Sequence, residues 1–312
     1  MQSNSQFDSG SYANLLDSLN KLAVSAGAAS IANCPAAYKI EGSHPGPRLL
    51  VSGIVHGNEP CGFYALKNLL QHFANGTGHL HRGTLTLVFA NIRAFIEGKQ
   101  HIDHNLNRLF IDSVAPSSLS VELTRAAELR PLYADTDYLL DLHSTTAPTI
   151  PFAMCEESAF DFAKTLGFSP LVVGWGALGA ASITGDTETY CNSKGGIGIT
   201  LECGQRDWPG GADYAYSAIH TFLNVLGMCE GTSLSISPSK LTVYRIKSVF
   251  SVRSKNFEYA KSFQSFDPLE PGELIGQDEI GPVYAPQKCI ILMPANPKER
   301  TIGQDLYLLA TR

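Results

Sequence analysis

The sequence predicts an α/β fold: a mostly parallel mixed sheet flanked by helices, followed by a small C-terminal β domain. Up to residue 231, apolar strand-like segments alternate with segments of helical periodicity, which is typical of parallel sheets. After residue 231 the helical periodicity stops, and short β-like pieces punctuated by Pro and Gly replace it. We therefore expect one domain over residues 1–231 and a second over 232–312, with 232–239 as the linker.

The individual elements follow from the spacing of apolar residues. Strands are expected where short apolar runs are bounded by turn residues, at 48–55, 84–91, 138–143, 151–155, 171–173 and 196–203. The run 85–90 is apolar except for Thr86, which fits burial on both faces of a sheet. Helices are expected where apolar residues recur every three or four positions, at 11–27, 60–74, 121–133, 156–166 and 211–226. The C-terminal β pieces are expected at 241–252, 289–293 and 305–310.

Composition narrows the class of protein. The 312 residues are 44% hydrophobic, which suffices for a large core. The 23 basic and 29 acidic residues give a net charge of −6 without any Lys/Arg block, so we expect no nucleic-acid partner. No apolar run approaches the roughly 18–20 residues of a membrane span, and no secretory signal is seen. A homo-oligomer is left open.

The cysteines indicate a cytoplasmic protein. There are seven, which is an odd number, and no C-x-x-C occurs. This pattern fits neither a disulfide framework nor a four-cysteine zinc site. Reduced thiols in the cytoplasm are the simplest interpretation.

A histidine and a carboxylate follow the first strong strand. Residues 49–62 read LLVSGIVHGNEPCG, so the strand ends at His56, a Gly-Asn turn follows, and Glu59 and Pro60 begin a helix. Open α/β sheets build their sites at the carboxyl ends of strands. His56 and Glu59 are therefore placed where both can reach one metal ion.

His143 supplies a third ligand at the end of another apolar strand, in YLLDLHSTT. Catalytic zinc sites typically use three protein ligands and leave a further position for water. Asp141 lies two residues earlier on the same face of the strand, where a carboxylate would orient the imidazole. A single histidine at a strand end is usually only a polar loop residue, so the prediction of one Zn²⁺ per chain depends on the two motifs together.

Glu202 is the predicted catalytic carboxylate. It is the only charged residue between Lys194 and Arg206, on an otherwise apolar strand, GGIGITLECG. Burial there should raise its pKa and suit it to proton transfer. Metal-assisted hydrolysis of an amide needs a group that takes a proton from water and passes it to the leaving amine, and one carboxylate can do both. The alternative is a glutamate that simply faces water at a strand end.

Four short motifs resemble those of a known family. HGNE (56–59), NLNR (105–108), DLHST (141–145) and LECG (201–204) occur in the order and spacing of the succinylglutamate desuccinylase/aspartoacylase family, relatives of the zinc carboxypeptidases. The resemblance extends over the whole chain, because that family also carries a small C-terminal β domain. It implies a zinc carboxypeptidase-like fold.

The resemblance also implies roles for individual residues. It assigns zinc to His56, Glu59 and His143, and the general base and acid to Glu202. By the same resemblance, Asn107 and Arg108 bind a substrate carboxylate.

The sequence departs from the family pattern at three positions. Gln100 stands where the family usually has an arginine that polarises the scissile carbonyl, so Gln100 is the expected substrate contact there. Asn105 replaces an acid, and Asn192 stands where aspartoacylases place an arginine for a second carboxylate. These departures speak against dicarboxylate substrates such as N-acetylaspartate.

A glycine-rich segment, GWGALG (174–179), has the spacing of a dinucleotide-binding turn. Such a turn would have to open a helix, whereas residues 180–190 are rich in Ser, Thr and Gly. We therefore expect a loop beside the site and no nucleotide.

The predicted function is a zinc-dependent deacylase that hydrolyses the amide C–N bond of an N-acyl amino acid or a related small amide. A carboxypeptidase-like metallopeptidase acting on short peptides is one alternative, and a pocket narrowed by the C-terminal domain would argue against it. A non-catalytic metal-binding protein is the other: Gln100 keeps it open, whereas Glu202 argues against it. The sequence leaves open the acyl group, the amine and the metal used in the cell.

Overall fold

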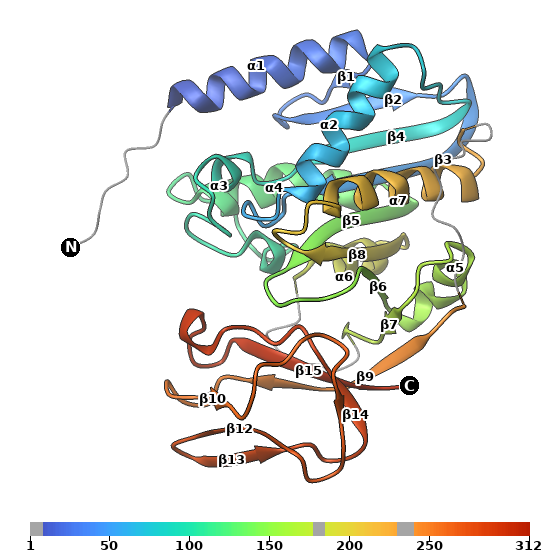
Figure 1. Cartoon of the computed structure of the whole chain (residues 1–312). Helices are drawn as coiled ribbons and strands as arrows, with labels where there is room; N and C mark the ends of the chain where they lie inside the picture. The colour runs from blue at the N-terminus through green and yellow to red at the C-terminus, as the bar shows by residue number, and fades with distance from the viewer. Residues whose placement is uncertain (1–8, 177–184, 230–239) are drawn as a thin grey trace.

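The computed structural model describes residues 9–176, 185–229 and 240–312, and it confirms the predicted α/β class (Figure 1). In these residues a twelve-stranded sheet has the order β1-β2-β4-β3-β5-β8-β6-β7-β9-β15-β14-β11. Its strands are β1 (Ala29–Ser30), β2 (Ala37–Glu41), β3 (His44–Gly53), β4 (Arg82–Phe89), β5 (Tyr138–Thr145), β6 (Phe152–Cys155), β7 (Leu171–Val173), β8 (Ile197–Gln205), β9 (Val243–Ser251), β11 (Pro268–Leu269), β14 (Cys289–Leu292) and β15 (Asp305–Thr311).

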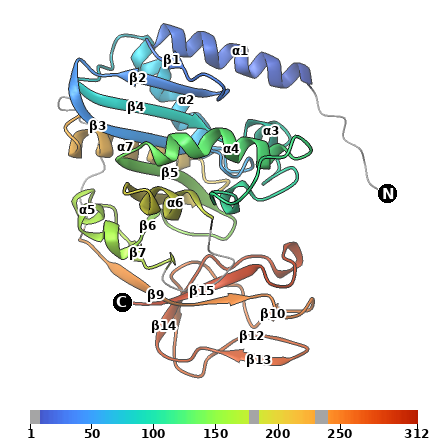
Figure 2. The ribbon, with the colours of Figure 1, turned by 180° about the vertical axis from the view of Figure 1, so that it is seen from behind.

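Helices cover both faces of this sheet. They are α1 (Ser9–Ser25), α2 (Cys61–Ala74), α3 (Ile92–Ile96), α4 (Val121–Ala134), α5 (Phe160–Thr165), α6 (Thr187–Ser193) and α7 (Gly211–Val225). Figure 1 shows α2 and α7 in front of the sheet, and Figure 2 shows α4 and α6 on the opposite side. Leu49 and Val51 of β3 pack in the core under α2, whereas Leu50 packs in the core under α4. The alternating side chains of β3 are therefore buried on both faces, which is why the strand reads as a continuous apolar run.

The parallel centre of the sheet brings strand ends together. β4, β3, β5 and β8 are parallel neighbours, and Gly53 pairs with Leu142, which pairs with Leu201. One residue further along, His143 pairs with Glu202. Because the carboxyl ends of parallel strands meet at one edge, residues almost 150 positions apart in the sequence, from His56 to Glu202, come together there.

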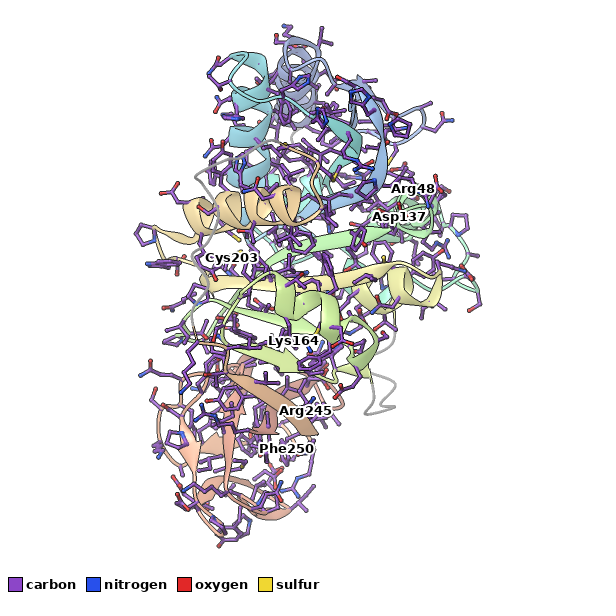
Figure 3. The ribbon with its side chains drawn as sticks, turned by 90° about the vertical axis from the view of Figure 1, so that its right-hand side faces the viewer. Arg48, Asp137, Lys164, Cys203, Arg245 and Phe250 are labelled. Carbon is purple, nitrogen blue, oxygen red and sulfur yellow. The ribbon has the colours of Figure 1, made fainter. Side chains whose placement is uncertain are left out.

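The C-terminal residues extend the same sheet. β9 is parallel to β7, and β15, β14 and β11 continue it in antiparallel fashion. β10 (Glu258–Tyr259), β12 (Leu274–Asp278) and β13 (Gly281–Tyr284) form a second, three-stranded sheet. This region has its own apolar cluster, which includes Phe257, Ile275 and Tyr307. Figure 3 shows it below the layered part of the molecule, with Arg245 and Phe250 on β9. The division into domains at residue 231 stays a prediction, since the main sheet runs across it.

Three sequence predictions need correction or fall outside the described residues. The segment 156–166 is a 3-10 turn, Glu157–Ala159, followed by α5, and not one helix. The segment 180–190 was expected to be a loop, but α6 begins at Thr187, because the Asp186 side chain accepts a hydrogen bond from the N–H of Thr189 and caps the helix. The linker 232–239 and most of the loop after Gly176 lie outside the described residues.

No helix among the described residues combines the length and apolarity needed to cross a bilayer.

Candidate active site

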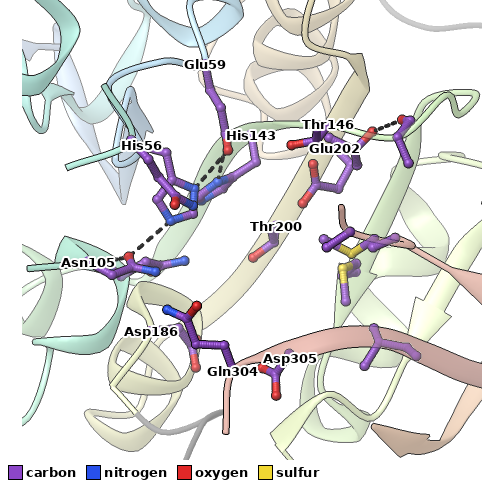
Figure 4. Close-up of a pocket in the computed structure, with 18 of the residues that line it drawn as sticks. His56, Glu59, Asn105, His143, Thr146, Asp186, Thr200, Glu202, Gln304 and Asp305 are labelled. Atoms are coloured by element: carbon purple, nitrogen blue, oxygen red, sulfur yellow. Dashed lines mark hydrogen bonds and ion pairs between the residues drawn. The ribbon is translucent and has the colours of Figure 1, made fainter. Parts of the chain in front are cut away.

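A pocket of about 480 Å³ opens at the carboxyl edge of the parallel strands. Its lining comes from the β3–α2 turn, from β5 and β8, from the 3-10 turn Leu106–Arg108, from the start of α6 and from β15. Figure 4 shows His56, Glu59 and His143 on one side of it and Asp186, Gln304 and Asp305 on another. The predicted residues of both the metal site and the catalytic site therefore line a single cavity.

Glu59 lies between two imidazoles. Its Oε1 is 2.9 Å from Nδ1 of His56, and its Oε2 is 3.1 Å from Nδ1 of His143. The three ligand atoms lie within 4.8 Å of one another, and this is the one such group of His, Cys, Asp and Glu found in the described residues. Two imidazole nitrogens and a carboxylate are a donor set suited to zinc.

The far nitrogen of each imidazole is also engaged. Nε2 of His143 lies 2.9 Å from Oδ2 of Asp141, a buried carboxylate. Nε2 of His56 lies 3.1 Å from Oδ1 of Asn105, and the same oxygen accepts a hydrogen bond from the N–H of Asn107. Both contacts require Nε2 to donate, so Nδ1, the atom that faces Glu59, is the nitrogen that each ring can offer to a metal ion once it carries no proton. The tautomers that these neighbours select are those that a shared metal ion needs.

Burial and charge set the ionisation of this group. Burial opposes ionisation of Glu59, but His56 and His143 outweigh it and hold the pKa of the carboxyl below its usual range. Burial likewise lowers the pKa of His143, yet Asp141 and Glu59 overcome it and raise the pKa well above the ordinary value. The protein has thus surrounded the imidazole with negative charge, an arrangement that favours a cation at this point.

Glu202 lies beside His143 in the neighbouring strand, and only 5% of it is exposed. Its Oε2 is buried and has no hydrogen-bond partner in the described part of the chain. Burial raises its pKa to about 8; His143 partly opposes this, whereas Glu59 and Asp141 add to it. A carboxyl group with a pKa near neutrality and an unengaged oxygen is suited to accept and return a proton.

The predicted substrate-binding residues line the same pocket. The backbone oxygen of Gln100 accepts the N–H of Gly57, which places Gln100 beside the β3–α2 turn that carries His56 and Glu59. Nη1 of Arg108 donates to the backbone oxygen of Asn107 at 2.7 Å, and Nη2 lies 3.8 Å from Oδ2 of Asp305. Asn192 does not line this pocket, because its side chain accepts the N–H of Gly198 at 2.7 Å.

Residues 45–227, more than half of the chain, match the family described as the succinylglutamate desuccinylase/aspartoacylase catalytic domain. The chain belongs to this family. The match contains all three candidate metal ligands and Glu202, and it ends before the C-terminal β strands.

Individual members of the family cover only part of the chain in sequence. An N-acyl-aromatic-L-amino acid amidohydrolase (carboxylate-forming) of Rattus norvegicus is 37% identical over 114 residues, which is 33% of this chain and 34% of that protein. A succinylglutamate desuccinylase of Burkholderia thailandensis is 38% identical over 81 residues, 26% of this chain and 23% of that protein. The chain thus spans about a third or less of the curated relatives it matches.

Solved structures of the family extend the likeness in fold. The crystal structure of succinylglutamate desuccinylase from Vibrio cholerae has a TM-score of 0.71 at 20% identity, and covers 89% of this chain and 86% of that one. The similarity in fold therefore extends beyond residues 45–227 into the C-terminal region, which the family match omits.

Several pocket residues of this family member were not predicted from its sequence: Asp186, Glu188, Thr200, Arg206, Arg300 and Asp305. Thr200 could have been found, because it lies two residues before Glu202 and so faces the same side of β8. In the sequence, Asp186 lies in a segment expected to be a loop, and Asp305 begins one of the expected C-terminal β pieces. Nothing local in the sequence shows that these two meet Arg108.

Proposed function

We propose that this family member is a zinc-dependent deacylase that hydrolyses the amide bond of an N-acyl amino acid. The observation on which this depends most is the buried, unpartnered carboxylate oxygen of Glu202 beside the group formed by His56, Glu59 and His143. A protein that only bound a metal would have no use for this carboxylate, whose burial without a hydrogen bond is costly.

The chain's own residues account for the steps of the reaction. Arg108 and Asn107 would hold the substrate carboxylate and so place the scissile amide in front of Glu202. When bound, zinc would supply Lewis acidity toward the amide carbonyl and the attacking water. Glu202 would take the proton from that water and deliver it to the leaving nitrogen. The amide N–H of Gln100 would donate to the carbonyl oxygen where the family usually has an arginine.

The shape of the pocket favours small substrates. Met293, which follows β14, Arg300 in the loop before β15, and Leu308 of β15 line it together with residues of the parallel sheet. A wall on this side limits how far a substrate can extend beyond the group that Arg108 holds. This supports an N-acyl amino acid over a longer peptide. A cytoplasmic location and a homo-oligomer stay predictions.

The test compares wild type with Glu202→Gln, which keeps the shape of the side chain and removes its charge. Both proteins are stripped with a chelator, reloaded with zinc, and assayed on N-acetyl and N-succinyl amino acids and on dipeptides. We expect hydrolysis of N-acyl amino acids that needs zinc and falls about 10³-fold in the variant, with about one zinc still bound per chain.

Each other outcome overturns a particular element of the proposal. Dipeptide hydrolysis without deacylation would make the protein a peptidase. Bound zinc without turnover would leave a metal-binding protein, and no bound zinc would remove the metal site itself.

A further inference from the structure

Two buried carboxylates line the pocket that holds the metal-binding residues. Asp186, the cap of α6, is 5% exposed, and Glu188, in its first turn, is 3% exposed. Oδ2 of Asp186 and Oε1 of Glu188 are buried, and neither has a hydrogen-bond partner in residues 9–176, 185–229 and 240–312. Figure 4 shows Asp186 across the pocket from Glu59 and His56.

The other oxygen of each carboxylate is fixed by the fold. Oδ1 of Asp186 accepts the N–H of Thr189 at 2.7 Å, and Oε2 of Glu188 accepts the hydroxyl of Thr200 at 2.7 Å. Each side chain is therefore held in one orientation, with a second oxygen left unpaired. Such an oxygen costs free energy unless a ligand or a solvent molecule satisfies it.

The charges around Asp186 and Glu188 balance the negative charge of these two carboxylates only in part. Burial raises the pKa of Asp186, and the hydrogen bonds from Thr189 and then the charge of Arg108 oppose the shift only in part. Burial also raises the pKa of Glu188 well above its ordinary value, and the nearby carboxylates of Asp186 and Glu156 add to the effect. A cation at this place would relieve the repulsion that the fold has built in.

We propose that Asp186 and Glu188 form a subsite for an ammonium group, so that the preferred substrate is an N-acyl amino acid with an amine in its side chain. Arg108, whose charge acts on Asp186, would bind the carboxylate of the same substrate. The same two carboxylates would repel a second carboxylate and so disfavour a dicarboxylate. The hydrolytic part of this proposal rests on the function proposed above, whereas the binding preference does not.

Binding tests the subsite without turnover. L-Ornithine and L-norleucine have side chains of equal length that end in an ammonium and a methyl group, and calorimetry with the zinc-loaded protein compares them directly. We expect wild type to bind ornithine at least about tenfold more tightly, the gain of one charge-assisted contact. In Glu188→Gln and in Asp186→Asn the ratio should fall toward one; Asn is itself a good helix cap, so α6 is retained.

A matched control removes one negative charge elsewhere. Asp213 is exposed on α7 and does not line the pocket, so Asp213→Asn should keep the wild-type ratio. Equal binding of the two amino acids by wild type would overturn the subsite, as would a preference that survives in both pocket variants.

Turnover separates the two proposals. kcat/KM is measured for Nα-acetyl-L-ornithine and Nα-acetyl-L-norleucine with wild type and both pocket variants. A preference for the ornithine derivative of at least about tenfold that is lost in the variants supports both proposals. Equal hydrolysis of the two substrates would sink the subsite and leave the deacylase. A binding preference for ornithine without hydrolysis of either acetyl derivative would sink the deacylase and leave the subsite.

Discussion

The two sides of the pocket differ in how their polar groups are satisfied. On the metal side, both nitrogens of His143 have a partner, as do both nitrogens of His56. On the opposite side, which we call the recognition side and define by Arg108, Asp186 and Glu188, two carboxylate oxygens have no partner in the described residues. The two imidazoles are therefore held in place in advance, as metal binding requires. Among the residues described, the unpaired oxygens of the metal side, Oε2 of Glu202 and Oδ1 of Asp141, lie on carboxylates beside His143, whereas those of Asp186 and Glu188 can gain a partner from a ligand. Changes on the metal side should therefore alter metal binding and kcat, and changes on the recognition side should alter KM.

The two histidines of the metal side also differ from each other. His143 is supported by a carboxylate, Asp141, which in addition accepts the hydroxyl hydrogen of Thr187. His56 is supported by the neutral amide of Asn105. A carboxylate makes its imidazole a stronger electron donor to a metal than an amide does. His143 should therefore be the better supported of the two ligands.

Among the variants that test this comparison, Asp141→Asn should have the largest effect, and it should act on zinc binding. Loss of the carboxylate should weaken zinc binding by about 10–100-fold, because the imidazole of His143 loses both its orientation and part of its basicity. Zinc affinity measured by competition with a chromogenic chelator checks this. The conservative variant Thr187→Ser, which keeps the hydroxyl that Asp141 accepts, serves as the control. Unchanged affinity in Asp141→Asn would show that the carboxylate has only a structural role.

Arg108→Lys should act next most strongly, and on KM. Lysine keeps the charge but cannot present two parallel N–H donors, so one charge-assisted hydrogen bond to the substrate carboxylate is lost. We expect KM for an N-acyl amino acid to rise about tenfold, with a smaller change in kcat and unchanged zinc content. A fall in kcat without a change in KM would mean that Arg108 acts in the chemical step. It would then contradict the division of the pocket into a metal side and a recognition side.

Asn105→Asp should strengthen zinc binding, and by a smaller factor than Asp141→Asn weakens it. The new carboxylate would support His56 as Asp141 supports His143, and would still accept the N–H of Asn107. Zinc affinity should rise by about threefold to tenfold, the lower end of what such supporting groups contribute. The same chelator competition measures it, and unchanged or weaker binding would contradict the view that the carboxylate of Asp141 makes His143 the better supported ligand.

The smallest expected effect is a change with pH in the thermal stability of the metal-free protein. The pKa of Glu202 is about 8 in the folded chain against an ordinary 4.5, so between these values the folded state holds a proton that the unfolded state has lost. Stability from this group is complete below the ordinary value and is lost as the pH rises toward 8. Wild type should therefore lose at least about 2–4 °C in Tm relative to Glu202→Gln between pH 5 and pH 8. A constant Tm difference over this range would contradict the raised pKa.

The α/β class, the candidate metal ligands and Glu202 could be predicted from the sequence alone, because each of these predictions depends on short segments of the chain. HGNE, DLHST and LECG end apolar strands, and parallel strands must align their carboxyl ends at one edge. Their convergence could therefore be predicted without knowing the rest of the fold.

Arg108 of the recognition side was expected from the family resemblance, whereas Asp186 and Glu188 were placed beside the pocket only by the tertiary structure. Asp186 lies in a segment that the sequence predicts as a loop, and Arg108 and Asp305 are almost 200 residues apart in the sequence. They meet because the C-terminal strands join the main sheet through β9, a pairing that no motif encodes. Which distant segments close a cavity depends on the packing of the whole chain. This is why the candidate metal ligands and Glu202 could be predicted from the sequence, while Asp186 and Glu188 of the proposed subsite could not.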